Sequence, residues 1–222
     1  MFIDTANLAQ IKEGFSLGVL KGVTTNPSIL LKEGKKREQI IEEILTISEG
    51  IVFVQAAGSN YEEMLADCEE ILALNHERIG LKIPANIDGF KVIKELKSRD
   101  NAPIILATAI FSADQGILCG LAGCDYIAPY VNRMENNNID PYEVVRKTRK
   151  IYDDRGITTQ ILAASFKNTN QVVDIFAAGA HTATIPYDIL HQMATKELAA
   201  ASIKGFNHDW DELQRSIVLE KE

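Results

Sequence analysis

Lys82 lies inside an apolar run, Ile79-Gly80-Leu81-Lys82-Ile83-Pro84, whose composition is typical of a buried strand. An ammonium group is costly to take out of water, so a lysine in such a place tends to lose its proton. A neutral amine can attack a ketone carbonyl and form a Schiff base, which withdraws electrons from a neighbouring carbon–carbon bond. A lysine at a strand end can equally extend to solvent or pair with an acid. The segment alone leaves both interpretations open.

Other polar residues occur near the expected ends of buried strands, and most are uncharged hydrogen-bonding groups. They are Asp4, Thr24, Asn26, Gln55, Thr108, Tyr130, Asn132, Arg133, Ser165 and Lys167. This composition suits a polyhydroxylated ligand better than a metal ion. The histidines at 76, 181, 191 and 208 show no ligand spacing with one another or with the cysteines, so we expect no catalytic metal.

The elements that must position these residues follow from the hydrophobic pattern. Short apolar segments alternate with amphipathic segments of helical period, which indicates repeated βα units and a parallel sheet. We expect strands at 2–4, 22–24, 51–55, 79–83, 104–107, 126–129, 159–163 and 182–185. We expect helices at 38–48, 61–74, 89–98, 112–122, 142–154 and 170–178. Glycines 50, 123, 156 and 179 follow helices, where a left-handed backbone favours glycine.

Eight such units in 222 residues predict an α/β fold of one domain over 1–222, a closed (β/α)8 or TIM barrel. Catalytic residues of these barrels gather at the carboxyl ends of the strands, where the polar residues above are expected. Residues 194–222 form an additional C-terminal helical extension. Its apolar residues allow it to cap its own barrel or to dock on a neighbouring subunit.

The composition of the chain limits which binding partners and which cellular compartment we expect. The formal net charge is −8 and the pI is about 5.1, so nucleic acid and anionic membranes are not expected partners. The three cysteines, at 68, 119 and 124, have no framework spacing, which indicates reduced thiols in a cytoplasmic protein. No apolar stretch has the length of a membrane span and no basic leader is present, so neither insertion nor export is expected.

Four segments resemble the signature segments of the small transaldolase family. They are Val23-Thr24-Thr25-Asn26-Pro27-Ser28, Leu81-Lys82-Ile83-Pro84, Ala128-Pro129-Tyr130-Val131-Asn132-Arg133 and Ala163-Ala164-Ser165-Phe166-Lys167. The resemblance runs from Asp4 to Asp209-Trp210, with the motifs in the same order. At positions 55 and 130 the chain resembles the fructose-6-phosphate aldolase subgroup, which has glutamine and tyrosine there. Transaldolases of this family typically have glutamate and phenylalanine at these positions.

The resemblance implies class I aldolase chemistry without a metal or another cofactor, in which Lys82 forms the Schiff base with the C2 carbonyl of a ketose. Asp4 would assist proton transfer, and its alternative role is to cap a helix that begins near Asn7. Asn26 would hydrogen-bond the dihydroxyacetone moiety, with Thr24 or Thr25 supporting the loop. A simple turn before the following proline is the alternative for these loop residues.

The expected activity is reversible cleavage of fructose 6-phosphate to dihydroxyacetone and glyceraldehyde 3-phosphate, a step in carbohydrate metabolism next to the pentose phosphate pathway. Gln55, Thr108 and Tyr130 are the catalytic positions that bear on this choice of activity. The amide of Gln55 and the phenol of Tyr130 are expected to hold the water that hydrolyses the Schiff base, although Tyr130 could instead be a rim aromatic. The alternatives are a transaldolase that transfers the three-carbon unit to erythrose 4-phosphate, and a phosphosugar-binding protein without catalysis. Phe111 stands where some aldolases of the subgroup have tyrosine, which leaves substrate detail open.

The sugar phosphate needs a cation or a cluster of donors. Arg133 has a planar fork suited to phosphate, and Ser165 lies in the loop after the seventh expected strand, where such barrels often bind phosphate. Lys167 is either an auxiliary cation or a solvated loop charge. The resemblance also implies a homo-oligomer, commonly a decamer of two pentameric rings, in which the C-terminal helix reaches a neighbour.

Overall fold

The short apolar segments form parallel strands that close into a barrel. The computed structural model describes residues 1–74 and 77–219. Over these residues each strand pairs with the next along the chain, and the last pairs with the first. The strands are β1 (Phe2–Asp4), β2 (Gly22–Thr24), β3 (Ile51–Gln55), β4 (Ile79–Pro84), β5 (Ile105–Ile110), β6 (Tyr126–Pro129), β7 (Gln160–Ala163) and β8 (Thr182–Ile185). The predicted (β/α)8 barrel is confirmed.

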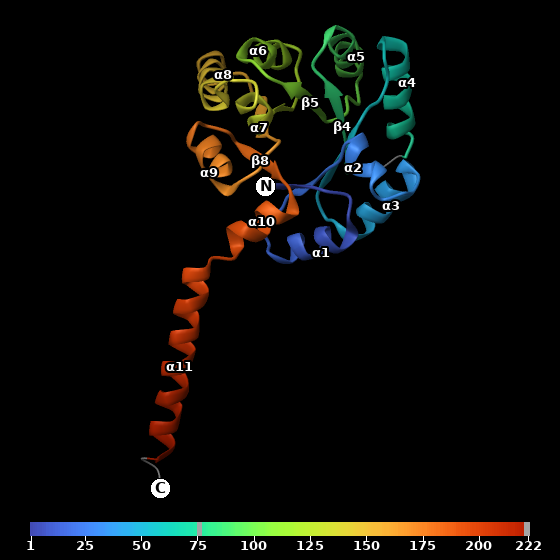
Figure 1. Ribbon diagram of the computed structural model, residues 1–222. Coiled ribbons are helices and arrows are strands. Elements are labelled where there is room, and N and C mark those ends of the chain that lie inside the picture. The colour runs from blue at the N-terminus through green and yellow to red at the C-terminus, as the bar shows by residue number, and fades with distance from the viewer. Residues whose placement is uncertain (75–76, 220–222) are drawn as a thin grey trace.

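Helices surround the barrel and turn their apolar faces toward it (Figure 1). They are α1 (Leu8–Ser16), α2 (Pro27–Leu31), α3 (Arg37–Ile47), α4 (Tyr61–Leu72), α5 (Ile87–Lys97), α6 (Ala113–Leu121), α7 (Val131–Glu135), α8 (Pro141–Arg155), α9 (Thr169–Ala177) and α10 (Tyr187–Ala194). The six predicted amphipathic helices are all present. The predicted ranges did not include α1, α2, α7 and α10. For α2 and α7 the reason is their length, because five residues are too few to show a helical period.

Aromatic and aliphatic side chains fill the inside of the barrel. The rings of Phe2, Phe53 and Tyr126 contact one another with centroids 5.5–6.2 Å apart. Gly22 and Gly80 make room for two of these rings, since a Cβ at Gly80 would lie 2.5 Å from Phe53 Cε1. Further inward side chains belong to Leu106, Ala128, Leu162 and Ala164. The inside of the barrel below the polar carboxyl ends of the strands is therefore filled by packed apolar side chains.

Two local predictions need correction. Strand β5 continues to Ile110 rather than ending at residue 107, because the pairing register with β6 shifts between Ala107 and Ile110 and leaves Ala109 with a φ of 59°. Gly50 does not have a left-handed backbone, whereas the glycines at 123, 156 and 179 do. Gly50 is required by close packing instead, since a Cβ there would lie 1.9 Å from the carbonyl oxygen of Lys21.

Helix α11 (Glu197–Leu219) extends away from the barrel (Figure 1). Its large apolar side chains are exposed, with Leu198 at 85%, Phe206 at 68% and Trp210 at 59%. The predicted C-terminal helix is confirmed, and this chain does not fold it back over its own barrel. Among the described residues, none of the helices has the length and apolar character to cross a membrane.

Candidate active site

Lys82 stands on β4 with its side chain enclosed by the protein. The residue is 2% exposed, and its Nζ makes a long contact of 3.5 Å with the carbonyl oxygen of Thr25. No ion pair joins Lys82 to an acid within the described ranges. The amine is therefore neither extended into bulk solvent nor neutralised by a carboxylate, the two alternatives to a nucleophilic role.

A cavity of about 380 Å³ opens at the carboxyl ends of the strands, and Lys82 lines it. Seven of the predicted site residues meet in its wall, from the ends of β1, β2, β4, β6 and β7. They are Asp4, Asn26, Lys82, Tyr130, Arg133, Ser165 and Lys167. The wall also includes Asn132, Asn136, Ala164, Phe166 and Pro186. Asn136, which follows the last residue of α7, thus belongs to the cavity wall.

Asp4 is held by a row of hydroxyl groups. Thr24 Oγ1 donates to Asp4 Oδ1 at 2.6 Å and lies 2.7 Å from Thr184 Oγ1. Both threonines are buried, so Thr24 stands behind Asp4 rather than in the cavity wall. Asp4 does not cap α1, because Asn7 Oδ1 accepts the N–H groups of Ala9 and residue 10. Thr184 was not among the predicted site residues. It is the strand partner of Phe2, whose side chain points into the barrel, so Thr184 also lies on the inner face.

Tyr130 is fixed on three sides. Its hydroxyl lies 2.8 Å from Thr108 Oγ1, the ring of Phe111 contacts it edge-on at 5.6 Å, and the guanidinium of Arg133 lies 4.8 Å from its ring centroid. The last distance is within the range of a cation–π contact. Thr108 is fully buried and supports the phenol from outside the wall.

The strand register places Gln55 next to Lys82. It is the Cα partner of Lys82 in the pairing of β3 with β4. Partners in adjacent parallel strands present their side chains on the same face of the sheet, so Gln55 and Lys82 both belong to the inner face. Gln55 is not among the residues that line the cavity.

Asn26 both caps a helix and faces the cavity. Its Oδ1 accepts the N–H of Ile29 at 3.0 Å and so begins α2, which fixes the side chain and leaves its NH₂ group as a donor. Thr25 instead donates to the carbonyl oxygen of Phe53 at 3.0 Å. Thr25 therefore supports the loop and Asn26 presents a polar group to the cavity.

The opposite side of the cavity is cationic. Arg133 and Lys167 are exposed there, and neither forms an ion pair with an acid in the described part of the chain. Ser165 precedes Lys167 by two residues in the loop that joins β7 to α9. It has a φ of 65°, and its carbonyl oxygen accepts the N–H of Asn132 at 2.8 Å. An anion that enters this side of the cavity meets two unneutralised cations and a hydroxyl.

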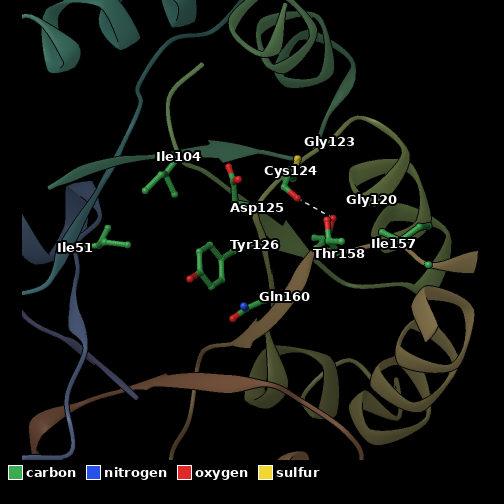
Figure 2. A pocket seen from close by; sticks show the side chains of 12 residues that line it. Ile51, Ile104, Gly120, Gly123, Cys124, Asp125, Tyr126, Ile157, Thr158 and Gln160 are labelled. Carbon is green, nitrogen blue, oxygen red and sulfur yellow. Dashed lines mark hydrogen bonds between the residues drawn. The ribbon is translucent and has the colours of Figure 1, made fainter. Parts of the chain in front are cut away.

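A second cavity, of about 430 Å³, lies at the amino-terminal ends of β3, β5, β6 and β7 (Figure 2). The carboxylate in its wall, Asp125, accepts hydrogen bonds from Lys97 Nζ at 2.5 Å and from the N–H of Ile105 at 2.7 Å. This end of the barrel therefore serves packing, as is usual for the fold. Within the described ranges no group of three or more His, Cys, Asp or Glu side chains is placed to hold a metal ion.

A closed barrel with a buried lysine at the carboxyl ends of its strands has the fold of a class I aldolase. Residues 1–218 match the family model described as transaldolase/fructose-6-phosphate aldolase. The chain belongs to this family, whose members are Schiff-base aldolases and transaldolases.

Relatives support the family assignment, and a solved structure supports the fold. A probable transaldolase of Alkaliphilus metalliredigens is 38% identical over 96% of this chain and 98% of its own length. One of Desulforudis audaxviator is 37% identical over 97% and 99%. A flavocytochrome b2 variant with sulfite bound has a TM-score of 0.61 at 15% identity, covering 86% of this chain and 57% of its own. That last similarity concerns the fold alone.

Proposed function

We propose that this protein is a class I aldolase that reversibly cleaves fructose 6-phosphate to dihydroxyacetone and glyceraldehyde 3-phosphate. The observation that carries the proposal is the buried amine of Lys82 in one cavity with a carboxylate, a phenol and unpaired cations. The ketose would lie with C2 at Lys82 and its phosphate at Arg133, Ser165 and Lys167. The reduced state of the three buried cysteines suits action in the cytoplasm.

The covalent steps use only residues of the cavity and water. Lys82 Nζ adds to C2 and the carbonyl oxygen leaves as water, which forms an iminium ion. The C3–C4 bond then breaks, its electron pair enters the iminium as an enamine, and the proton of the C4 hydroxyl passes to Asp4. Glyceraldehyde 3-phosphate leaves. The enamine takes a proton at C3, and hydrolysis releases dihydroxyacetone and restores the amine.

The choice between an aldolase and a transaldolase depends on the hydrolysis step. Tyr130 lines the same cavity as Lys82 and is held there by Thr108, and Gln55 is the partner of Lys82 on the neighbouring strand. A phenol and an amide can hold a water molecule without adding a negative charge. These groups support rapid release of the three-carbon unit. The names of the relatives support the second candidate, transfer of that unit to erythrose 4-phosphate with formation of sedoheptulose 7-phosphate.

The deciding experiment follows glyceraldehyde 3-phosphate released from fructose 6-phosphate without an acceptor aldehyde, at an enzyme concentration high enough to see one equivalent. An aldolase gives many turnovers. A burst of about one equivalent per active site that then stops shows that the three-carbon unit stays on Lys82 and that the protein is a transaldolase.

A second measurement tests the Schiff base itself. Borohydride reduction in the presence of fructose 6-phosphate should add the mass of the reduced three- or six-carbon adduct to the peptide that contains Lys82. The Lys82→Met variant should keep its fold by circular dichroism, lose the adduct and lose turnover by at least about 10³-fold. If the wild-type protein binds fructose 6-phosphate but gives no adduct on reduction, it is a phosphosugar-binding protein without catalysis.

A further inference from the structure

Two loops at the mouth of the site are built in the same way. At the end of β5, Ala109 has a φ of 59°, and in the loop that follows, the N–H of Phe111 donates to Gln115 Oε1 at 2.9 Å. In the loop after β7, Ser165 has a φ of 65° and the N–H of Lys167 donates to Gln171 Oε1 at 2.8 Å. A left-handed backbone is unfavourable for a residue other than glycine, so it persists only where the surroundings hold it.

Gln171 holds more than its own loop. It is 4% exposed, and its Nε2 donates to Glu135 Oε2 and, at 3.3 Å, to Asn132 Oδ1. Asn132 in turn donates its N–H to the carbonyl oxygen of Ser165. The other carboxylate oxygen of Glu135 accepts the hydroxyl of Tyr142 at 2.7 Å.

One amide side chain thus ties the loop that carries Ser165 and Lys167 to α7, the helix that carries Arg133. Gln115 has the same helical position and the same backbone contact, but its Nε2 donates to the carbonyl oxygens of Ala85 and Ala109 at 3.2 and 3.4 Å. The two glutamines share their local geometry and differ in what they connect.

We propose that Gln171 is a positioning residue for the phosphate end of the substrate. It fixes the spacing between the Arg133 guanidinium and the Ser165–Lys167 loop, so that both sides contact one phosphate group. The inference rests on the proposed function, because it assumes that a sugar phosphate occupies this cavity. Gln171 has no direct part in the chemistry at Lys82, so its effect falls on phosphate recognition.

The test is an exchange of charge between Gln171 and Glu135. Gln171→Glu keeps the acceptor for the Lys167 N–H but removes the donor to Glu135 and places two carboxylates face to face. The double variant Gln171→Glu/Glu135→Gln restores one donor and one acceptor in the reverse direction. Each variant is assayed with fructose 6-phosphate and in the addition of dihydroxyacetone to unphosphorylated glyceraldehyde.

Gln171→Glu should raise KM for fructose 6-phosphate about tenfold or more, the scale of one lost hydrogen bond to a charged group, with kcat within about threefold. The unphosphorylated reaction should keep its kcat/KM, and the double variant should return KM to within about threefold of wild type. Gln115→Glu, the matched control in the other loop, should leave KM for fructose 6-phosphate unchanged. If Gln171→Glu does not fold, Gln171→Met has a similar length and carries the same measurement.

Asn168→Ala separates positioning from helix stability. Asn168 Oδ1 caps α9 by accepting the N–H of Gln171 at 2.9 Å. Loss of this cap weakens the helix but leaves the contact between Gln171 Oε1 and the Lys167 N–H in place. An equal KM increase in Asn168→Ala, equal losses in both reactions, or no rescue in the double variant would overturn the inference. A wild-type protein that does not turn over fructose 6-phosphate would instead overturn the proposed function, and the inference with it.

Discussion

At the scale of single residues, Asp4 depends on a neutral hydroxyl for its orientation. Thr24 donates to it at 2.6 Å and has Thr184 behind it. Thr24→Val has nearly the same shape but removes the donor. A hydrogen bond to a charged group is worth about 1.5–3 kcal/mol, so kcat should fall about 10- to 100-fold. Thr24→Ser should stay within about threefold of wild type in the same assay, and equal kinetics of the two variants would contradict this role.

Tyr130 allows the phenol to be separated from its ring. Tyr130→Phe keeps the contacts with Phe111 and Arg133 and removes only the hydroxyl beside Thr108. We expect release of free dihydroxyacetone to slow about tenfold relative to transfer of the unit to erythrose 4-phosphate. The ratio of dihydroxyacetone to sedoheptulose 7-phosphate measures this directly. An unchanged ratio would mean that the phenol does not help to place the hydrolytic water.

At the scale of elements, Gly50 is required by contact and Gly156 by backbone conformation. A Cβ at Gly50 would lie 1.9 Å from the backbone oxygen of Lys21, whereas Gly156 has a φ of 64° and open space around it. Gly50→Ala should therefore lower the free energy of unfolding by more than about 2 kcal/mol, and Gly156→Ala by about 1 kcal/mol. Urea unfolding of both variants checks the order, and a smaller loss at Gly50 would show that the strands can move apart.

The start of β8 offers a pH-dependent contact. His181 Nδ1 accepts the N–H of Ile161 at 2.9 Å, which requires a neutral imidazole nitrogen. Partial burial, and then the nearby charge of Arg149, lower the pKa of His181 from its ordinary value. The unfolded chain therefore takes up the proton first as the pH falls below about 6.5, and the folded state loses stability over that range.

His181→Asn keeps an acceptor near the same place but cannot be protonated. The free energy of unfolding of wild type should therefore fall relative to that of the variant between pH 7.5 and 5.5, as followed by urea unfolding at both pH values. Parallel behaviour of the two proteins would show that the imidazole takes up its proton equally in the folded and unfolded chain.

The barrel and the wall of its cavity follow from local pattern, whereas the supports of that wall do not. Lys82 is conspicuous because a charge interrupts an apolar strand, and the strand count fixes where its neighbours gather. Thr184 and Gln171 carry no such signal, since a threonine in a strand and a glutamine in a helix are ordinary. Their importance depends on partners 160 and 36 residues away, Thr24 and Glu135, which only the closed barrel brings near.

At the scale of the whole molecule, none of the described residues covers the large apolar side chains of α11 between Leu198 and Leu213. Ile203, Phe206, Trp210 and Leu213 recur at spacings of three and four residues, which places them on one side of a helix. All four are at least 50% exposed, although helices in proteins are stabilised mainly by burying such a face. We propose, with the family resemblance, that this face docks on a neighbouring copy in a ring-built homo-oligomer.

Removal of residues 196–222 should then lower the particle mass measured by light scattering while the barrel keeps its circular dichroism. The full-length double variant Phe206→Ala/Trp210→Ala should have the same effect without shortening the chain, because it removes the largest apolar side chains of the stripe. His208→Ala changes the opposite side of the helix and should leave the mass unchanged. A particle mass that does not change on truncation would show that the assembly forms without α11, and that its apolar face has another partner.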